Sequence, residues 1–418
     1  MASGPLDAVV QLPGSKSATN RALVLAALGE GRSVLHRPLR SRDTLLMAQG
    51  LRDLGVEVAD RGADWVVGGR PSAPGPDQAS IDVGNAGTVA RFLPAVAALG
   101  TARVRFDGDP RVRERPIGPL LLALRQLGVD LDRVDALPLT ISGHGRVGGG
   151  AAVIDASASS QFVSGLLLAA PRFERGLVLT HVGGRLPSAP HIAMTVAALR
   201  RAGVTVNADA GTWTVTAGPI TAGRHDIEPD LSTAAAYLAA PLVAGGQVTV
   251  DGWPDDSIQP GAILPDLLAA MGGEVTRTAS SVTVRAGRGL HGLDVDLGDA
   301  PELTMVLAAL AALADSPSRF TGVAHIRLQE TDRLAALATE LTALGGDVSE
   351  LTDGLEIRPR PLTGTRVRSY DDHRVAMAWA VLGLAVPGVE VDDIATTGKT
   401  VPDFTGSWDR MLAVSGGP

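Results

Sequence analysis

The chain has 418 residues, of which 45% are apolar and 20% charged, and this length predicts two domains with sizeable cores. The formal net charge of −8 argues against a nucleic-acid binder that works by bulk electrostatics. The absence of cysteine excludes disulfides, thiolate metal sites and cysteine nucleophiles.

The N-terminal segment has no basic region followed by an apolar one, so we expect no signal peptide. The apolar stretch from Leu231 to Ala244 is short and broken by Ser, Thr and Pro, and we expect it not to span a bilayer. A cytoplasmic protein without membrane partners is the simplest prediction.

The first predicted helix begins near Ser17, after a strand that ends at Pro13. Its start brings together Ser15, Lys16 and Arg21, where free backbone N–H groups, the helix dipole and two cations favour an anion. The phosphate loop G-x-x-x-x-G-K-[ST] is absent. A Ser-capped helix with solvated cations is the alternative.

A second predicted turn, over residues 85–88, leads into a helix, and Gly87 would let a ligand approach the backbone closely. Further along, Arg111, Arg113 and Arg115 are predicted to crowd one helix start ahead of Pro116. Cations at a helix N-terminus oppose the dipole, so this cluster indicates a bound anion.

Hydroxyl and amide donors precede the next apolar helix, at Ser157, Ser159, Ser160 and Gln161. Capping a helix needs only one Ser, so the excess indicates ligand contacts.

Polar residues also open two helices in the C-terminal half. The segment 330–333 is Glu-Thr-Asp-Arg, and Thr331 or Asp332 is the expected cap. The segment 371–374 is Asp-Asp-His-Arg, where Asp372 is expected to hold Arg374, and a metal site is the weaker alternative. Near the C-terminus, Lys399 follows a glycine, as phosphate-reaching lysines often do.

An internal repeat organises the chain. Five segments combine the end of an amphipathic helix, a glycine and an alternating strand, about 70 residues apart. A turn and a second strand follow each. This spacing predicts an α/β unit repeated about six times, with one unit completed by the two chain ends and with buried apolar helices at 231–242 and 303–313. The shared glycines, which suit a left-handed helix end, are Gly55, Gly128, Gly203, Gly272 and Gly345.

The segments PGSKSATNRAL, GNAGT, DPRVRERPIG, SSQF, PSAPHI, ETDRLAALATEL, DDHRVAMA and KTVPDF occur in order between residues 13 and 404. With them the chain resembles the 5-enolpyruvylshikimate-3-phosphate synthase family. The resemblance implies an α/β fold, a two-domain inverse α/β barrel of six βαβαββ units, three per domain, with the active site in the interdomain cleft. It implies domains at 13–227 and at 1–12 plus 228–418, joined by two hinge crossovers.

The family's reaction moves the enolpyruvyl (carboxyvinyl) group of phosphoenolpyruvate to the 5-hydroxyl of shikimate 3-phosphate and releases phosphate. The resemblance therefore implies these two substrates, a tetrahedral ketal intermediate, no metal or organic cofactor, no nucleic-acid partner, a monomer and a glyphosate target. The domain 13–227 would carry most shikimate 3-phosphate contacts, and the other would complete the phosphoenolpyruvate site.

The resemblance also implies the residues of the site. Shikimate 3-phosphate would be held by Lys16, Ser17, Arg21, Ser159, Ser160, Gln161, Ser188, Glu302 and Gln329. Phosphoenolpyruvate would be held by Lys16, Gly87, Arg115, Gln161, Arg333, Arg374 and Lys399. Catalysis would use Glu302 as base, Glu330 as proton donor and Lys16.

Two positions depart from the family's pattern. Glu302 stands where Asp is common, which keeps a carboxylate one methylene longer, and Asp299 is a weaker substitute. Gln329 stands where Lys is common, so no proton can be delivered from that side chain. A smaller departure is His191, where the family often has Tyr.

Three other functions compete. The sister enolpyruvyl transferase acting on UDP-N-acetylglucosamine typically relies on a Cys acid, which this chain lacks. An RNA 3′-terminal phosphate cyclase of related fold should carry a nucleotide-linked His and a more basic surface. A non-catalytic anion-binding protein would have no need of the carboxylates at Glu302 and Glu330.

Overall fold

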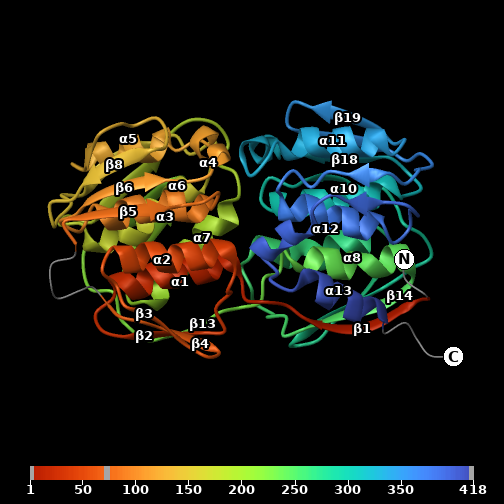
Figure 1. Ribbon diagram of the computed structural model, residues 1–418, viewed down its shortest axis with the longest axis horizontal. Helices are drawn as coiled ribbons and strands as arrows, with labels where there is room; N and C mark the ends of the chain where they lie inside the picture. Colours follow the sequence, from red (N-terminus) through yellow and green to blue (C-terminus); the bar gives the residue numbers. More distant parts are fainter. Residues whose placement is uncertain (1–3, 70–75, 414–418) are drawn as a thin grey trace. The chain divides into compact units, whose positions relative to one another are not determined.

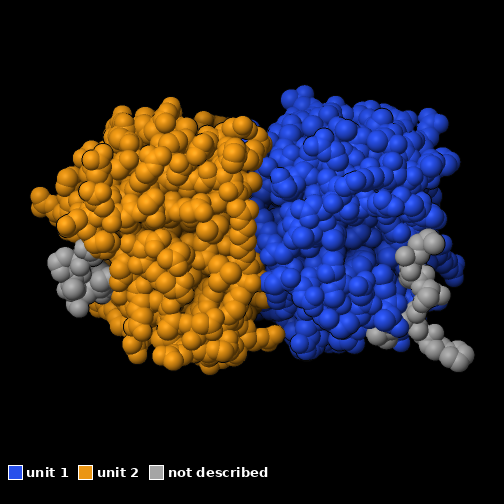
Figure 2. Space-filling view, viewed as in Figure 1, with its two compact units in different colours: residues 1–13, 229–418 blue, residues 14–228 orange. Residues whose placement is uncertain are grey.

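The computed structural model describes residues 4–69 and 76–413. The chain divides into two compact units, unit 1 (Met1–Pro13 with Pro229–Pro418) and unit 2 (Gly14–Glu228) (Figure 2). None of the helices in these described ranges has the length and apolar character that a membrane crossing requires.

In the part of unit 2 that the structure describes, twelve strands form three four-stranded sheets. The strands are β2 (Ser33–His36), β3 (Val58–Arg61), β4 (Asp64–Val67), β5 (Gln78–Asp82), β6 (Arg103–Asp107), β7 (Asp130–Leu131), β8 (Leu139–Ser142), β9 (Gly150–Ile154), β10 (Leu177–His181), β11 (Val206–Asp209), β12 (Thr212–Val215) and β13 (Arg224–Asp226). The strand orders are β13-β2-β4-β3, β5-β6-β8-β7 and β11-β12-β10-β9.

The described part of unit 1 has two four-stranded sheets and one two-stranded sheet. The strands are β1 (Leu6–Gln11), β14 (Gly246–Asp251), β15 (Glu274–Arg277), β16 (Ser281–Arg285), β17 (Asp294–Asp296), β18 (Ser318–Thr321), β19 (Asp347–Leu351), β20 (Gly354–Arg358), β21 (Arg366–Val367) and β22 (Glu390–Val391). The orders are β1-β14-β16-β15, β17-β18-β20-β19 and β21-β22.

Every four-stranded sheet has the same pattern of one parallel pair followed by two antiparallel pairs. In the first, for example, β13 pairs with β2 in parallel, and β2 and β3 both pair antiparallel with β4. The other four sheets repeat this arrangement. The predicted α/β fold of repeated small units is thus confirmed.

The glycines of the repeat stand where a helix ends and the next strand begins. All five have a φ between 82° and 101°, which a glycine adopts without the steric cost that a Cβ brings. The helices that they follow are α2 (Arg42–Asp53), α5 (Gly118–Gln126), α7 (Ala189–Arg201), α9 (Leu264–Ala270) and α11 (Arg333–Ala343).

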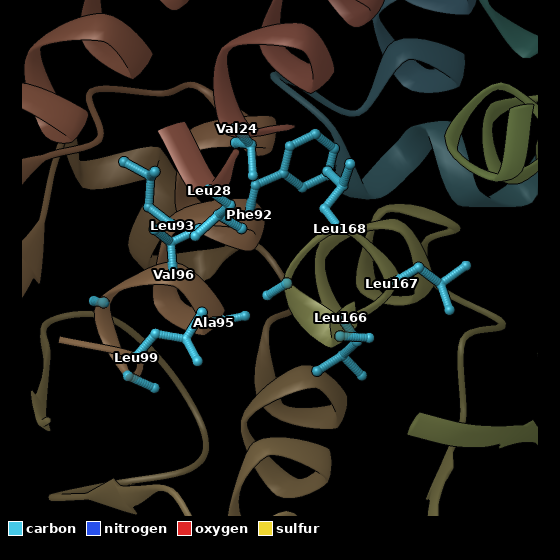
Figure 3. Packing of buried hydrophobic residues seen from close by; sticks show 14 of the residues in the cluster. Val24, Leu28, Phe92, Leu93, Ala95, Val96, Leu99, Leu166, Leu167 and Leu168 are labelled. Atoms are coloured by element: carbon cyan, nitrogen blue, oxygen red, sulfur yellow. The ribbon is translucent and has the colours of Figure 1, made fainter. Parts of the chain in front are cut away.

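The core of unit 2 lies around three helices, α1 (Lys16–Leu28), α3 (Gly87–Ala97) and α6 (Gln161–Ala169). They are apolar on most of their surface, as a helix enclosed by other elements must be. Figure 3 shows their side chains in one cluster, with Val24, Phe92 and Leu168 among them. At Gly165 the backbones approach so closely that a Cβ would collide with the carbonyl oxygen of Arg91.

Unit 1 has a second core around α8 (Ala234–Ala244), α10 (Thr304–Ala312) and α12 (His373–Leu382), which pack against one another (Figure 1). Every residue of α10 is buried, and α8 is buried from Ala234 to Pro241. The burial predicted for these two segments is confirmed, although α8 begins three residues later than expected. The C-terminal helix α13 (Phe404–Ala413) packs against β1.

Candidate active site

In unit 2, α1 begins at Lys16, and the side chain of Ser15 caps it by accepting a hydrogen bond from the N–H of Ala18 at 3.3 Å. The Lys16 side chain is 15% exposed, and its ammonium lies 3.3 Å from the buried carboxylate of Asp43. The helix start was thus predicted to within a residue. The alternative of solvated cations is wrong, because Lys16 and Arg21 are both largely buried.

Arg21, one turn into α1, is only 2% exposed. Its guanidinium donates to neutral oxygens: Thr195 Oγ1 at 2.7 Å, Ser164 Oγ at 3.4 Å, and the carbonyls of His191 and Ser17 at 2.8 and 2.9 Å. Burial lowers the pKa of Arg21 to about 10. A buried cation held by neutral groups alone is well placed to take its counter-charge from an anionic ligand.

Two guanidinium groups converge above the first turn of α3. A Cβ placed on Gly87 would lie 2.6 Å from Arg91 Nη1, 2.7 Å from Arg115 Nη2 and 3.0 Å from Gln161 Oε1. Arg91 Nη1 donates to Gln161 Oε1 at 3.0 Å, and Arg91 Nη2 donates to the carbonyl of Pro116 at 2.9 Å. The lack of a Cβ at position 87 therefore lets two guanidinium groups and an amide come close to the start of α3.

The three arginines predicted at one helix start are not together. Arg111 and Arg113 lie in a short separate helix, α4 (Pro110–Glu114), and form ion pairs on the surface. Arg115 is buried and donates to the backbone and side-chain oxygens of Asn85 at 2.8 and 2.9 Å. The prediction is wrong for the first two, because the chain ends α4 before Arg115 and begins α5 only at Gly118.

The serines before α6 have different surroundings. Ser160, at the cap position, is buried, and Ser159 Oγ accepts from the N–H of Gln161 at 3.3 Å. Ser157 Oγ instead accepts from the N–H of Gly184 at 2.8 Å and supports a loop. Ser188, before α7, is buried and has the left-handed φ of 52°, a strained conformation that often marks functional sites.

In unit 1, Arg333 is the first residue of α11, and it is buried among acidic and polar groups. It donates to the Asp372 carboxylate at 2.8 and 3.2 Å, to Glu330 at 3.1 Å, and to Gln329 Oε1. Burial lowers its pKa, but the charges of Asp372 and Glu330 outweigh burial and raise the pKa above its usual range. Asp332 caps α11, as one of the two predicted candidates.

Glu330 lies between two cations. Its Oε1 is 2.9 Å from Lys399 Nζ, and its Oε2 accepts from Arg333. Lys399 ends a 3-10 helix (Ile394–Lys399), and Glu302 lies in another (Pro301–Leu303), close enough for its charge to raise the pKa of Arg333. Unit 1 therefore brings together two predicted cations, Arg333 and Lys399, and both predicted catalytic carboxylates, those of Glu302 and Glu330.

Asp372 does not hold the Arg374 side chain, contrary to the prediction. Its carboxylate caps α12 by accepting from the backbone N–H of Arg374 at 2.9 Å, and it forms its ion pair with Arg333. Within residues 4–69 and 76–413, no group of three or more His, Cys, Asp or Glu side chains is arranged to hold a metal ion.

Sequence reasoning missed Arg91, Asp43 and Asp372 as partners of the predicted residues. A signal for Arg91 exists, because it stands four residues after Gly87 in an otherwise apolar helix and so lies on the same face. No local pattern pairs Asp43 with Lys16.

The sequence model of the EPSP synthase (3-phosphoshikimate 1-carboxyvinyltransferase) family matches residues 1–408. The chain belongs to this family. A 3-phosphoshikimate 1-carboxyvinyltransferase of Mycobacterium ulcerans (strain Agy99) is 51% identical over 420 residues, which cover 99% of this chain and 97% of the relative. The family resemblance and the carboxyvinyltransferase activity of the shikimate pathway, both predicted from the sequence, are thereby confirmed.

Two solved EPSP synthase structures from Acinetobacter baumannii share the fold. They have TM-scores of 0.80 and 0.79, and each covers 98% of this chain and 97% of its own at 22% identity. The roles of the individual site residues stay predictions.

Proposed function

We propose that the two clusters bind the anionic groups of shikimate 3-phosphate and phosphoenolpyruvate, and that carboxyvinyl transfer follows between them. The observation that carries this proposal is the burial of Arg21 among neutral groups, in a chain of net charge −8. Such an arrangement is costly unless a ligand supplies negative charge. The two substrates together bring two phosphates and two carboxylates, which suit arginine forks.

Shikimate 3-phosphate is assigned first to unit 2. Arg21 and Lys16 supply positive charge, and buried hydroxyls surround them. The full set is Lys16, Ser17, Arg21, Ser159, Ser160, Gln161 and Ser188, with Glu302 and Gln329 from unit 1. Gln329 contacts Arg333, so it is placed to orient that guanidinium even though it delivers no proton.

Phosphoenolpyruvate is assigned to cations of both units. In unit 2, the guanidinium groups of Arg91 and Arg115, which converge at Gly87, suit a carboxylate or phosphate. The full set is Lys16, Gly87, Arg115, Gln161, Arg333, Arg374 and Lys399. Arg91 is added here because it contacts both the glycine and Gln161.

In the proposed mechanism, Glu302 accepts the proton of the 5-hydroxyl as that oxygen forms a bond to C2 of phosphoenolpyruvate. Glu330 donates a proton to the methylene carbon, which becomes a methyl group, and a tetrahedral ketal results. Loss of a methyl proton and cleavage of the bond from C2 to the phosphate oxygen then release phosphate and the enol ether. Lys16, Arg115 and Lys399 stabilise the charge on the departing phosphate.

The proposed donor, Glu330, contacts two cations. Those cations favour its ionised form, which cannot donate a proton. When Arg333 and Lys399 turn toward an anionic substrate, their hold on the carboxylate weakens and protonation becomes easier. Substrate binding and acid catalysis would thus be linked at this residue.

We also infer the family's finer architecture: an inverse barrel of six βαβαββ units, hinges near residues 13 and 228, and an active site in the cleft between the domains. The five sheets of identical pattern and the sixth short sheet support it. The monomeric state and the cytoplasmic location stay predictions.

The test is phosphate release from phosphoenolpyruvate, with and without shikimate 3-phosphate and with no metal added. Release that requires both substrates is expected. Glu302→Gln should lower kcat by at least about 100-fold and leave the KM values within about threefold. An unchanged kcat would rule out Glu302 as the base, and no release by the wild type would overturn the proposal itself.

A further inference from the structure

The loop from Arg368 to Asp372, just before α12, has a strained backbone. Tyr370 and Asp371 are consecutive non-glycine residues with left-handed φ angles of 56° and 54°. Such residues are strained, and the strain persists only where surrounding contacts hold it. The loop leads directly into Asp372 and Arg374, so whatever holds it also places these side chains.

Helix α11 contacts this loop at two points on one face. Arg333 and Glu340 are seven residues apart, about two helical turns, and therefore lie on the same side of α11. Arg333 binds the Asp372 carboxylate at the end of the loop. Glu340 accepts from the Tyr370 hydroxyl at 2.6 Å and from the backbone N–H of Arg368 at 3.1 Å.

Glu340 is 5% exposed, and the two donors that bind its carboxylate, a tyrosine hydroxyl and a backbone N–H, are neutral. Burying a carboxylate without an ion-pair partner is unfavourable, and a simple packing role would be served as well by an apolar side chain. Burial and the Glu340 hydrogen bond raise the pKa of Tyr370 to about 12, which keeps its hydroxyl a donor near neutral pH.

Other contacts close the loop from its remaining sides. The Arg368 guanidinium lies over the Tyr370 ring, 4.7 Å from its centroid, and Trp379 Nε1 of α12 donates to the Arg368 carbonyl at 3.0 Å. The N–H of Ser369 donates to the Asp392 carboxylate at 2.7 Å. The tyrosine is thus fixed between α11 and α12.

We propose that Glu340 and Tyr370 form a clasp that positions the loop, and through it Arg374 and Asp372, for phosphoenolpyruvate. Both are positioning residues for the known reaction, since they act through the loop rather than on the substrate. The inference rests on the proposed assignment of phosphoenolpyruvate to Arg333 and Arg374.

The first experiment replaces Tyr370 by Phe, which removes the hydroxyl and keeps the ring. We expect the KM for phosphoenolpyruvate to rise about tenfold, as for loss of a hydrogen bond to a charged group. The KM for shikimate 3-phosphate should stay within about twofold, because a local shift of Arg374 affects one substrate. Equal changes in both KM values, or none, would overturn the clasp.

The chain offers a matched control, because it has only one other tyrosine. Tyr237 lies in unit 1, and its hydroxyl is 2.5 Å from Ser407 Oγ. Tyr237→Phe therefore loses a similar hydrogen bond far along the chain from the loop, and we expect both KM values to be unchanged. If Tyr237→Phe raised the KM for phosphoenolpyruvate as much as Tyr370→Phe does, the effect would come from a general loss of stability in unit 1, and the proposal would be overturned.

A double-mutant cycle tests whether the two residues act together. Glu340→Gln keeps one acceptor oxygen of two, so its effect should be smaller than that of Glu340→Ala. In the Glu340→Ala background, Tyr370→Phe should add less than twofold to the KM, whereas independent residues would give additive effects and refute the clasp. If Glu340→Ala does not fold, Tyr370→Phe and Glu340→Gln decide the matter. A wild type that releases no phosphate refutes the proposed function instead.

Discussion

The substitution Gly87→Ala should change the geometry of the binding site while leaving the stability of the fold nearly unchanged. The added Cβ would lie 2.6 and 2.7 Å from guanidinium nitrogens of Arg91 and Arg115, where about 3.5 Å is comfortable, so each must move by about 0.8 Å. Both are ends of long side chains, and the helix itself need not shift. We therefore expect the free energy of unfolding to fall by less than about 1 kcal/mol.

The binding site should be affected much more than the fold. Arg115 is fixed by two hydrogen bonds to Asn85, and Arg91 by bonds to Gln161 and to the carbonyl of Pro116. Moving both guanidinium groups out of position weakens their hydrogen bonds to the anionic substrate, which are worth about 1.5–3 kcal/mol, or roughly 10- to 150-fold in the KM for phosphoenolpyruvate. The family resemblance also predicts weaker inhibition by glyphosate.

The assay is steady-state phosphate release with each substrate varied in turn, together with urea unfolding. Gly218→Ala is the matched control, because this glycine lies in the same unit and a Cβ there would meet nothing within 4 Å. An unchanged KM for phosphoenolpyruvate in Gly87→Ala would refute the placement of that substrate. A loss of stability above about 3 kcal/mol would refute the claim that only the side-chain ends move.

Three further predictions follow from buried or coupled charges. Arg21→Met removes a buried cation held by neutral groups, so calorimetry should show roughly 100-fold weaker binding of shikimate 3-phosphate. Because burying that cation is costly in the free protein, the melting temperature should fall by no more than about 3 °C, and a larger fall would contradict this cost of burial. Asp372→Asn breaks the buried ion pair with Arg333 and should lower the free energy of unfolding, measured in urea, by about 3–5 kcal/mol. A loss below about 1 kcal/mol would show that this ion pair does not hold the loop and α11 together. The pKa of Tyr370 is raised to about 12 in the folded state, above the usual value near 10, so the stability that its neutral hydroxyl contributes is complete below about pH 10 and is lost as pH rises toward 12. In urea unfolding over that pH range, the free energy of unfolding of Tyr370→Phe should therefore decline less steeply with pH than that of the wild type. Equal slopes would contradict the raised pKa.

The repeat was predictable because its signal is local. A glycine at a left-handed helix end, followed by alternating strands, depends on a few neighbouring residues, and all five glycines have that φ. The buried helices were predictable for a similar reason, since an apolar surface on every side leaves only the interior. Their ends were less certain, as the late start of α8 at Ala234 shows.

The partners of the site residues could not be predicted, because they come from distant segments. Arg21 is held by Ser164, His191 and Thr195, more than 140 residues away along the chain. The partner of Asp372 is Arg333, 39 residues earlier, rather than the neighbouring Arg374. The arginine cluster failed for another reason, since two successive proline-containing helix starts, in α4 and α5, looked like one.

The pairing of β1 with β14 bears on how the chain can fold during its synthesis. Unit 2 is one continuous stretch, Gly14–Glu228, so all its strands are available before residues 229–418 are synthesised. In unit 1, Leu6 pairs with Gly246 and Gln11 with Asp251, so β1 is synthesised well before the strand that pairs with it. During synthesis, unit 2 is therefore complete first, while β1 still awaits its partner strand. Until then its backbone N–H and C=O groups can pair with other chains, which favours aggregation.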